Sequence, residues 1–146
     1  MTRREIGENY FKQGYNCAQS VVLAFKDLIG IEEEKAVKLI SGFGGGFGRM
    51  REVCGAVSGM VYVISAVEGY TSPTADTEKM NLYKTVQTLM KEFKAQNGSY
   101  ICAELMNGVK QDSPTPEKRT QEYYEKRPCA LLVGDACEIL EKYLSK

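Results

Sequence analysis

The chain has 146 residues, the usual size of one domain, so we expect a single domain over residues 1–146. Its 19 basic and 19 acidic residues balance, which excludes the strongly basic surface of a nucleic-acid-binding protein and favours a protein or a neutral small molecule as partner. There are five cysteines and no histidine, which excludes nucleophiles activated by histidine and metal sites built on imidazole.

Two features of the sequence bear on where the protein works. The longest apolar stretches, such as residues 61–67, are much shorter than the roughly 20 residues of a membrane-spanning helix, so we expect no membrane insertion. The first residues carry charges but no apolar segment typical of a signal peptide, so we expect a cytoplasmic protein. In the cytoplasm structural disulfides are uncommon, and clustered cysteines more often indicate metal binding or redox chemistry.

Helical periodicity dominates the chain and predicts an all-α fold, a compact bundle of about six helices with a glycine-rich loop. A first short helix ends before Gly14, and Asn16 is a suitable N-cap for a second helix that ends at Gly30. Residues 32–40 read as a third helix, because acidic residues fill its first turn and complement the helix dipole. The apolar stripe predicted for the second helix consists of Ala18, Val21, Val22, Phe25, Leu28 and Ile29.

Two longer helices are predicted in the middle of the chain. Residues 54–68 are almost all apolar or small and fit either a buried helix or a strand, and their length favours a helix. A long amphipathic helix begins near Thr74 or Asp76, either of which can cap it, and ends at Asn97. Its predicted apolar stripe consists of Leu82, Val86, Leu89 and Phe93.

The last part of the chain is more polar. Ser99 is predicted to cap a short helix that carries Cys102, and residues 112–116 are predicted to form a polar loop. Residues 117–126 are charged and only weakly amphipathic. The final helix is predicted over residues 128–144, because proline is favoured at the first helical position.

The cysteines fall into two kinds. Four of them are predicted to lie at helix starts, namely Cys17, Cys54, Cys102 and Cys129. Free amide groups and the positive end of the helix dipole stabilise a thiolate there, so we expect lowered pKa values for these thiols. Cys137 instead falls on the apolar stripe of the last helix and is predicted to pack in the core.

The spacing of the four cysteines gives no local motif. Their separations of 37, 48 and 27 residues match no zinc-ribbon, ferredoxin or Cys-x-x-Cys pattern. Any site that they share must therefore be assembled by the tertiary fold. The alternative is that they are buried cysteines without a chemical role, which is common for free cysteine.

Residues 41–48, Ser-Gly-Phe-Gly-Gly-Gly-Phe-Gly, form a glycine-rich segment. They lack a complete Gly-x-Gly-x-x-Gly register and a Gly-Lys-Ser/Thr ending, which disfavours nucleotide binding, although Arg49 and Arg51 could meet an anion. We expect the glycines to let backbone amides approach Cys54 or a bound cluster, with a tight helix crossing as the alternative. The glycines predicted to contribute to such a site are Gly45, Gly46 and Gly55.

Four cysteine-containing motifs extend over nearly the whole chain. They are Gly-Tyr-Asn-Cys-Ala-Gln at 14–19, Cys-Gly-Ala-Val-Ser-Gly at 54–59, Gly-Ser-Tyr-Ile-Cys at 98–102 and Pro-Cys at 128–129. Together they resemble the bacterial and archaeal C_GCAxxG_C_C family of redox-active proteins, whose label spells Gly-Cys-Ala where this chain reads Cys-Gly-Ala. The resemblance implies a redox role. It implies further that the four characteristic cysteines of the family correspond to Cys17, Cys54, Cys102 and Cys129, with no counterpart for Cys137.

Two kinds of chemistry fit four converging thiols. In the first, a cysteine pair cycles between dithiol and disulfide, with Cys54 as the attacking thiolate and a redox protein or a small molecule as partner. In the second, all four cysteines bind one iron-sulfur cluster or one zinc ion, which makes the protein an electron carrier, a sensor or a metal-stabilised module. A third hypothesis is a helical interaction protein whose cysteines are inert.

Overall fold

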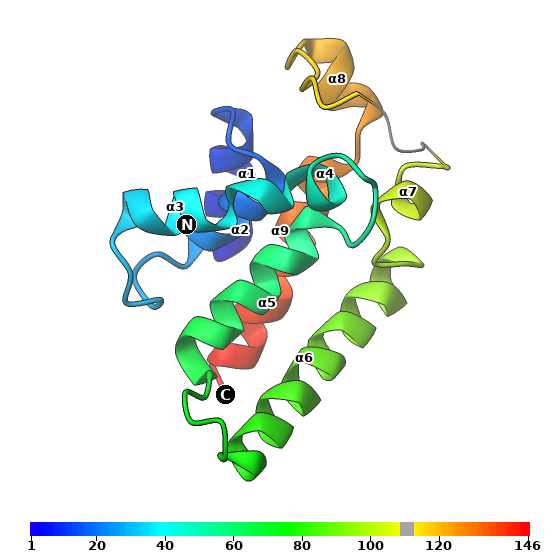
Figure 1. The fold of residues 1–146 in the computed structure, drawn as a ribbon. Coiled ribbons are helices and arrows are strands. Elements are labelled where there is room, and N and C mark those ends of the chain that lie inside the picture. The colour runs from blue at the N-terminus through cyan, green and yellow to red at the C-terminus, as the bar shows by residue number, and fades with distance from the viewer. Residues whose placement is uncertain (109–112) are drawn as a thin grey trace.

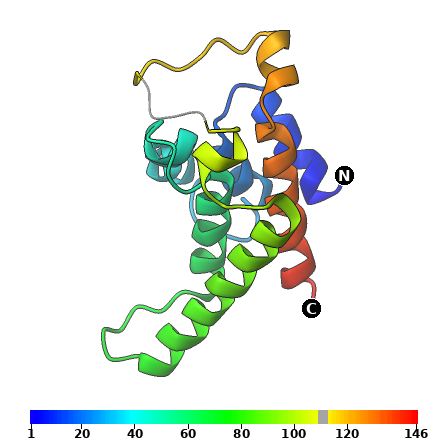
Figure 2. The ribbon, with the colours of Figure 1, turned by 90° about the vertical axis from the view of Figure 1, so that its right-hand side faces the viewer.

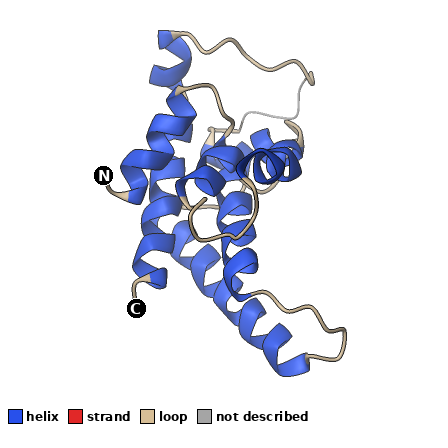
Figure 3. Ribbon diagram, turned by 90° about the vertical axis from the view of Figure 1, so that its left-hand side faces the viewer, coloured by secondary structure: helices blue, strands red, loops and turns tan. Residues whose placement is uncertain are grey.

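The computed structural model describes residues 1–108 and 113–146, and this part of the chain is all-α, as predicted (Figures 1 and 2). The longer helices are α1 (Arg3–Lys12), α2 (Cys17–Ala24), α3 (Glu33–Ile40), α5 (Gly55–Glu68), α6 (Asp76–Asn97) and α9 (Cys129–Leu144). Shorter helical segments are η1 (Ser41–Phe43), α4 (Gly44–Phe47), α7 (Cys102–Leu105) and α8 (Gln121–Lys126). The glycine-rich segment forms η1 and α4, although Gly45 and Gly46 within α4 have left-handed φ values of 71° and 76°. The described chain contains more helical segments than the six predicted (Figure 3).

Helix α5 lies at the centre of the core. It packs against α2, α6 and α9, while α1 packs against α2 and α9. Val57, Val63 and Ile64 of α5 are completely buried, and each such side chain stabilises the fold by about 1.5–3 kcal/mol. The close approach of α5 to α2 depends on Gly59, because a Cβ atom there would lie only 2.8 Å from the carbonyl oxygen of Ala18.

A capping box fixes the start of α2, and its N-cap is Asn16, as predicted. The Asn16 side chain accepts a hydrogen bond from the Gln19 amide at 2.8 Å, and the Gln19 side chain accepts one from the Asn16 amide at 3.1 Å. The side-chain amide of Asn16 also donates to the carbonyl oxygen of Ser41 at 3.0 Å. These bonds hold Cys17, the first residue of α2, next to the glycine-rich segment.

Helix α2 is shorter than predicted. It ends at Ala24 rather than near Gly30, and the residues that follow form turns. Phe25 and Ile29 are still buried, but Leu28 is 44% exposed, so the prediction that it lies on the buried stripe is wrong. The chain leaves the helical conformation at Phe25, whose φ is −123°, and the helical spacing no longer determines the direction of later side chains.

The two longer helices of the middle part form as predicted. Residues 55–68 are helical, which decides between the helix and strand readings in favour of the helix. Helix α6 ends at Asn97, followed by Gly98 in the left-handed conformation with φ of 87°. Its N-cap is Ala75, which makes no side-chain capping bond, so neither Thr74 nor Asp76 caps this helix.

The polar part of the chain forms two short helices before α9. Helix α7 has Ile101 as its N-cap, and the Ser99 hydroxyl accepts a hydrogen bond from the Ile101 amide at 2.9 Å, so Ser99 stabilises the preceding turn. The polar loop predicted over residues 112–116 begins at a residue outside the described part. Helix α8 is capped by Thr120. None of the described helices combines the length and the apolar character needed to cross a membrane.

Candidate functional site

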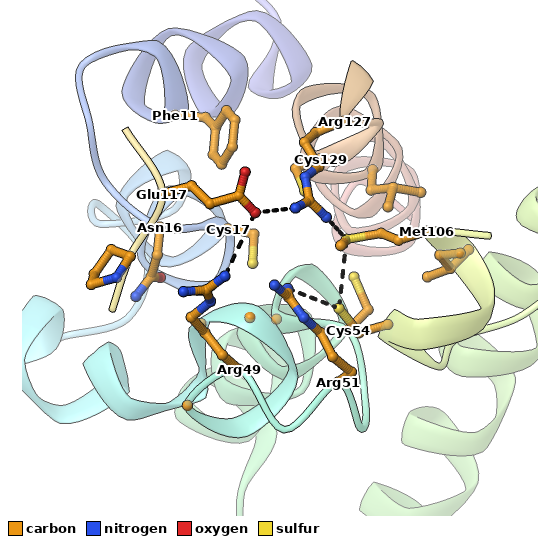
Figure 4. A pocket seen from close by; sticks show the side chains of 18 of the residues that line it. Phe11, Asn16, Cys17, Arg49, Arg51, Cys54, Met106, Glu117, Arg127 and Cys129 are labelled. Carbon is orange, nitrogen blue, oxygen red and sulfur yellow. Dashed lines mark hydrogen bonds and ion pairs between the residues drawn. The ribbon is translucent and has the colours of Figure 1, made fainter. Parts of the chain in front are cut away.

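The four cysteines predicted at helix starts line one cavity of about 380 Å³ (Figure 4). Cys17, Cys102 and Cys129 are the first residues of α2, α7 and α9, and Cys54 is the N-cap of α5. The starts of four helices that are distant in sequence therefore meet at this cavity. Cys137 is completely buried in α9 and does not line the cavity, and all five cysteines are free thiols.

A short antiparallel pairing holds the segment of Cys54 against that of Cys102, with Cys54 opposite Tyr100 and Cys102 opposite Glu52. Val53 and Ile101 form a β-bridge, and the amides of Cys54 and Cys102 each donate a hydrogen bond across it, at 2.8 and 2.6 Å. Successive side chains of an extended segment point to opposite faces. Cys54 and Cys102 therefore share the face opposite to Val53 and Ile101, and this face borders the cavity.

The glycine-rich segment closes around Cys17 and Cys102. The Gly45 amide donates a hydrogen bond to the Cys17 sulfur, so the amide contact expected for Cys54 is made to Cys17. A Cβ atom on Gly46 would lie 2.8 Å from the Cβ of Cys102, and one on Gly55 would overlap the Cys17 sulfur. Gly46 and Gly55 therefore lie against cysteines of the cavity where a larger residue has no room, whereas a Cβ atom on Gly45 would meet the Arg49 side chain at 2.9 Å.

Burial determines the ionisation of Cys17, Cys54 and Cys129. Burial is the largest cause of a raised pKa in all three thiols. The pKa of Cys17 is raised, that of Cys54 lies well above its ordinary value, and that of Cys129 is raised to about 12. The neighbouring thiols add to the rise, since the charges of Cys17 and Cys129 both act on Cys54. The lowered pKa values expected at helix starts are thus wrong for these three thiols, because desolvation outweighs the amides and the helix dipole.

We expect the reduced protein to lose stability as the pH rises above about 8.5, the usual pKa of a cysteine in an unfolded chain. Between this pH and the folded pKa of Cys129, about 12, the unfolded state binds fewer protons than the folded state. Each such thiol then lowers the free energy of unfolding by about 1.4 kcal/mol per pH unit. Urea denaturation from about pH 8 to about pH 11 under a phosphine reductant measures this slope. In Cys129→Ala the unfolding free energy should fall less steeply with pH, by about 1.4 kcal/mol per pH unit. An unchanged slope would contradict the raised pKa of Cys129.

The cavity also contains charged residues, and one of them approaches a thiol directly. Nη1 of Arg51 lies 3.8 Å from the Cys102 sulfur. The Met106 sulfur also lies 3.8 Å from the Cys102 sulfur, and Nη1 of Arg127 lies 3.4 Å from the Met106 sulfur. The charged residues that line the cavity are Arg49, Arg51, Glu117, Arg119 and Arg127.

The sequence pointed to only part of this charged set. Arg49 and Arg51 follow the glycine-rich segment and were noted there as residues that could meet an anion. Nothing in the local sequence distinguishes Arg119 and Arg127 from the other charged residues around them. Their contribution to the cavity is visible only in the tertiary structure.

The four cavity cysteines have the chemistry of a soft-metal site, but the described residues are not arranged as one. Four cysteines without histidine suit an iron-sulfur cluster or an all-cysteine zinc site. Within residues 1–108 and 113–146, no three cysteine, aspartate or glutamate side chains are positioned together to hold a metal ion.

Comparison with known proteins identifies the family. No curated protein and no solved structure matches the chain. Residues 15–143 match the family described as "Putative redox-active protein (C_GCAxxG_C_C)", and this range includes the four cavity cysteines. The chain therefore belongs to the C_GCAxxG_C_C family.

Proposed function

We propose that Cys17, Cys54, Cys102 and Cys129 form one redox centre that undergoes thiol–disulfide exchange with a partner protein or a small molecule. The observation that carries this proposal is the convergence of the four thiols on one cavity. Cysteines that serve only to fill the core need no such cavity, and Cys137 is an example in the same chain. Membership in a family described as redox-active supports the same function.

The surroundings of the thiols favour Cys102 as the first nucleophile. Its sulfur lies 3.8 Å from the guanidinium of Arg51, and reactive cysteines characteristically lie in such electropositive surroundings. Cys54, the attacking residue expected from its sequence motif, has a pKa raised well above the ordinary value by burial. Because it shares a face of the β-bridge with Cys102, we assign the second, resolving step to Cys54.

The proposed exchange is balanced in atoms and electrons. The Cys102 thiolate attacks one sulfur of the partner disulfide, the partner S–S bond breaks, and the leaving thiolate takes up a proton. Cys54 then loses its proton to the second partner sulfur as it attacks the Cys102 sulfur. A Cys54–Cys102 disulfide and two partner thiols result, so two electrons pass from the protein to the partner.

A second candidate function is a metal module in which the same four cysteines are the ligands. The observation that favours it is the hydrogen bond from the Gly45 amide to the Cys17 sulfur, because such bonds tune iron-sulfur clusters. A bound cluster would supply electron transfer, and a bound zinc ion would stabilise the fold.

Anaerobic purification followed by a visible spectrum, iron and zinc analysis and thiol titration tests the proposal. We expect a colourless, metal-free protein with five titratable thiols when unfolded. Mild oxidation with a small disulfide should remove thiols in pairs and leave Cys137 reduced, because Cys137 lies outside the cavity.

The other outcomes of this experiment separate the alternatives. Visible absorption with near-stoichiometric iron would replace the exchange mechanism with a cluster. A colourless protein that contains zinc and is destabilised by chelators would indicate a structural metal site. Five thiols that resist oxidation in the metal-free protein would leave a helical interaction protein with inert cysteines.

A further inference from the structure

Among the described residues that line the cavity, basic side chains outnumber acidic ones, although the whole chain is neutral. The described residues that line the cavity include four arginines and one glutamate, whereas the chain has 19 basic and 19 acidic residues. Most of the remaining lining is apolar or small, including Phe11, Leu105 and Leu132. Arginine side chains in a partly desolvated pocket are suited to bind carboxylates.

One carboxylate already occupies the position between two of these arginines. An oxygen of Glu117 contacts Nη2 of Arg127 and lies 3.6 Å from Nη2 of Arg49 (Figure 4). The two arginine side chains are only 17% and 15% exposed, whereas that of Glu117 is 40% exposed. The carboxylate of Glu117 therefore occupies the place where a carboxylate of a ligand would bind, and it is more exposed to solvent than either arginine.

Glu117 can leave this place without unfolding a helix. It lies outside any helix, before the Thr120 cap of α8. Two residues further on, Arg119 donates hydrogen bonds of 2.9 Å to the carbonyl oxygens of Phe11 and Tyr15, and its guanidinium lies 4.1 Å from the centre of the Phe11 ring. Arg119 therefore anchors the segment before α8 to α1 and to the turn after it. Glu117 lies in the same segment but outside any helix, so its side chain can move without breaking helical hydrogen bonds.

A series of contacts leads from this carboxylate position to the reactive thiol. Arg127, which binds Glu117, also contacts the sulfur of Met106 at 3.4 Å, and Met106 contacts the Cys102 sulfur at 3.8 Å. The carboxylate position and the Cys102 sulfur line the same cavity of about 380 Å³. A small ligand with a carboxylate at one end can therefore present a sulfur to Cys102 at the other.

We propose that the cavity binds a small anionic disulfide, whose carboxylate replaces that of Glu117 between Arg49 and Arg127. This inference rests on the thiol–disulfide function proposed above and adds the class of the substrate. The Cys102 thiolate attacks the nearer sulfur of the bound disulfide, the S–S bond breaks, and the released anionic thiol takes up a proton. Cys54 completes the exchange as described, and a dithiol reductant restores the two cysteines.

Two disulfides that differ in charge test the inference. The dicarboxylate dithiobis(nitrobenzoate) and the uncharged dithiodipyridine both release a coloured thiol, so the rate constants of the native, reduced protein with each can be measured. The ratio of the anionic to the neutral rate constant is the readout, because it cancels changes in thiol exposure. We expect the ratio to fall about tenfold in Arg127→Gln and to rise severalfold in Glu117→Gln, which removes the internal carboxylate.

The controls separate this inference from the function on which it rests. Lys91→Gln removes one positive charge from an exposed position of α6 and should keep the wild-type ratio. Arg49→Gln should lower the ratio as Arg127→Gln does, and it serves if the latter variant does not fold. Reaction of both disulfides with an unchanged ratio in the arginine variants would overturn the anionic substrate and leave the exchange function standing. If neither disulfide reacts with the native protein, both proposals fall.

Discussion

Replacing Gly46 with alanine is expected to lower the free energy of unfolding by about 3 kcal/mol or more. Gly46 is buried and has φ of 76°, a conformation that costs a residue with a side chain about 1 kcal/mol. A Cβ atom there would also lie 2.7 Å from the Glu52 amide nitrogen, 2.8 Å from the Cβ of Cys102 and 2.9 Å from the Arg51 Cα. Two of these atoms belong to the backbone, so they cannot move without disturbing the bridge between Val53 and Ile101.

Urea denaturation of the reduced protein measures this effect, and Gly30→Ala is the matched control. Gly30 has a similar φ of 68°, but a Cβ atom there would meet nothing within 4 Å. The control should therefore lose only about 1 kcal/mol, and the difference between the two variants reports the crowding at Gly46. Equal losses in the two variants would show that the backbone around Gly46 shifts to accommodate the added Cβ atom, and would contradict the predicted crowding.

Replacing Cys102 with alanine is expected to slow the reaction of the native protein with an uncharged disulfide about a hundredfold. Cys102 is the cavity thiol with a guanidinium 3.8 Å from its sulfur. The pKa of Cys54 is raised well above the ordinary value, and that of Cys129 is raised to about 12, so very little of either thiol is ionised near neutral pH. Stopped-flow measurement of thiol release from dithiodipyridine gives the rate constant directly.

Cys137→Ala is the control for this experiment. Cys137 is completely buried in α9 away from the cavity, so its replacement should leave the fast reaction intact. In Cys54→Ala we expect the first thiol to be released at the wild-type rate and the second release to be slowed, because Cys54 resolves the mixed disulfide. If Cys54→Ala abolishes the fast phase and Cys102→Ala does not, then Cys54 is the attacking residue, as its sequence motif suggested.

Much of the local structure could be predicted from the sequence because it depends on neighbours in the chain. The capping box of Asn16 and Gln19 is determined by residues three apart, and Gly98 ends α6 because glycine adopts the left-handed conformation at little cost. The same reasoning predicted the cysteines at the starts of their helices. It failed at Leu28, where the helix ended early and the periodic spacing no longer applied.

The ionisation of the thiols could not be predicted in this way. A helix start by itself favours a thiolate, and for Cys17, Cys54 and Cys129 this local effect is outweighed by burial. Burial depends on which other elements cover the helix start, and those elements come from distant parts of the chain. The charge of the cavity has the same origin, since a neutral composition does not reveal that Arg119 and Arg127 line the same cavity as the four cysteines.

The sequence by itself determined the all-α class, most helix ends, the core position of Cys137 and the set of four cysteines, because periodicity, capping and motif are written in short stretches of chain. Only the tertiary structure decided that the four cysteines share a cavity, that the Gly45 amide donates to the Cys17 sulfur, and that Arg51 lies beside Cys102. These facts depend on how α2, α5, α7 and α9 pack, and packing between distant segments follows from shape complementarity over the whole core.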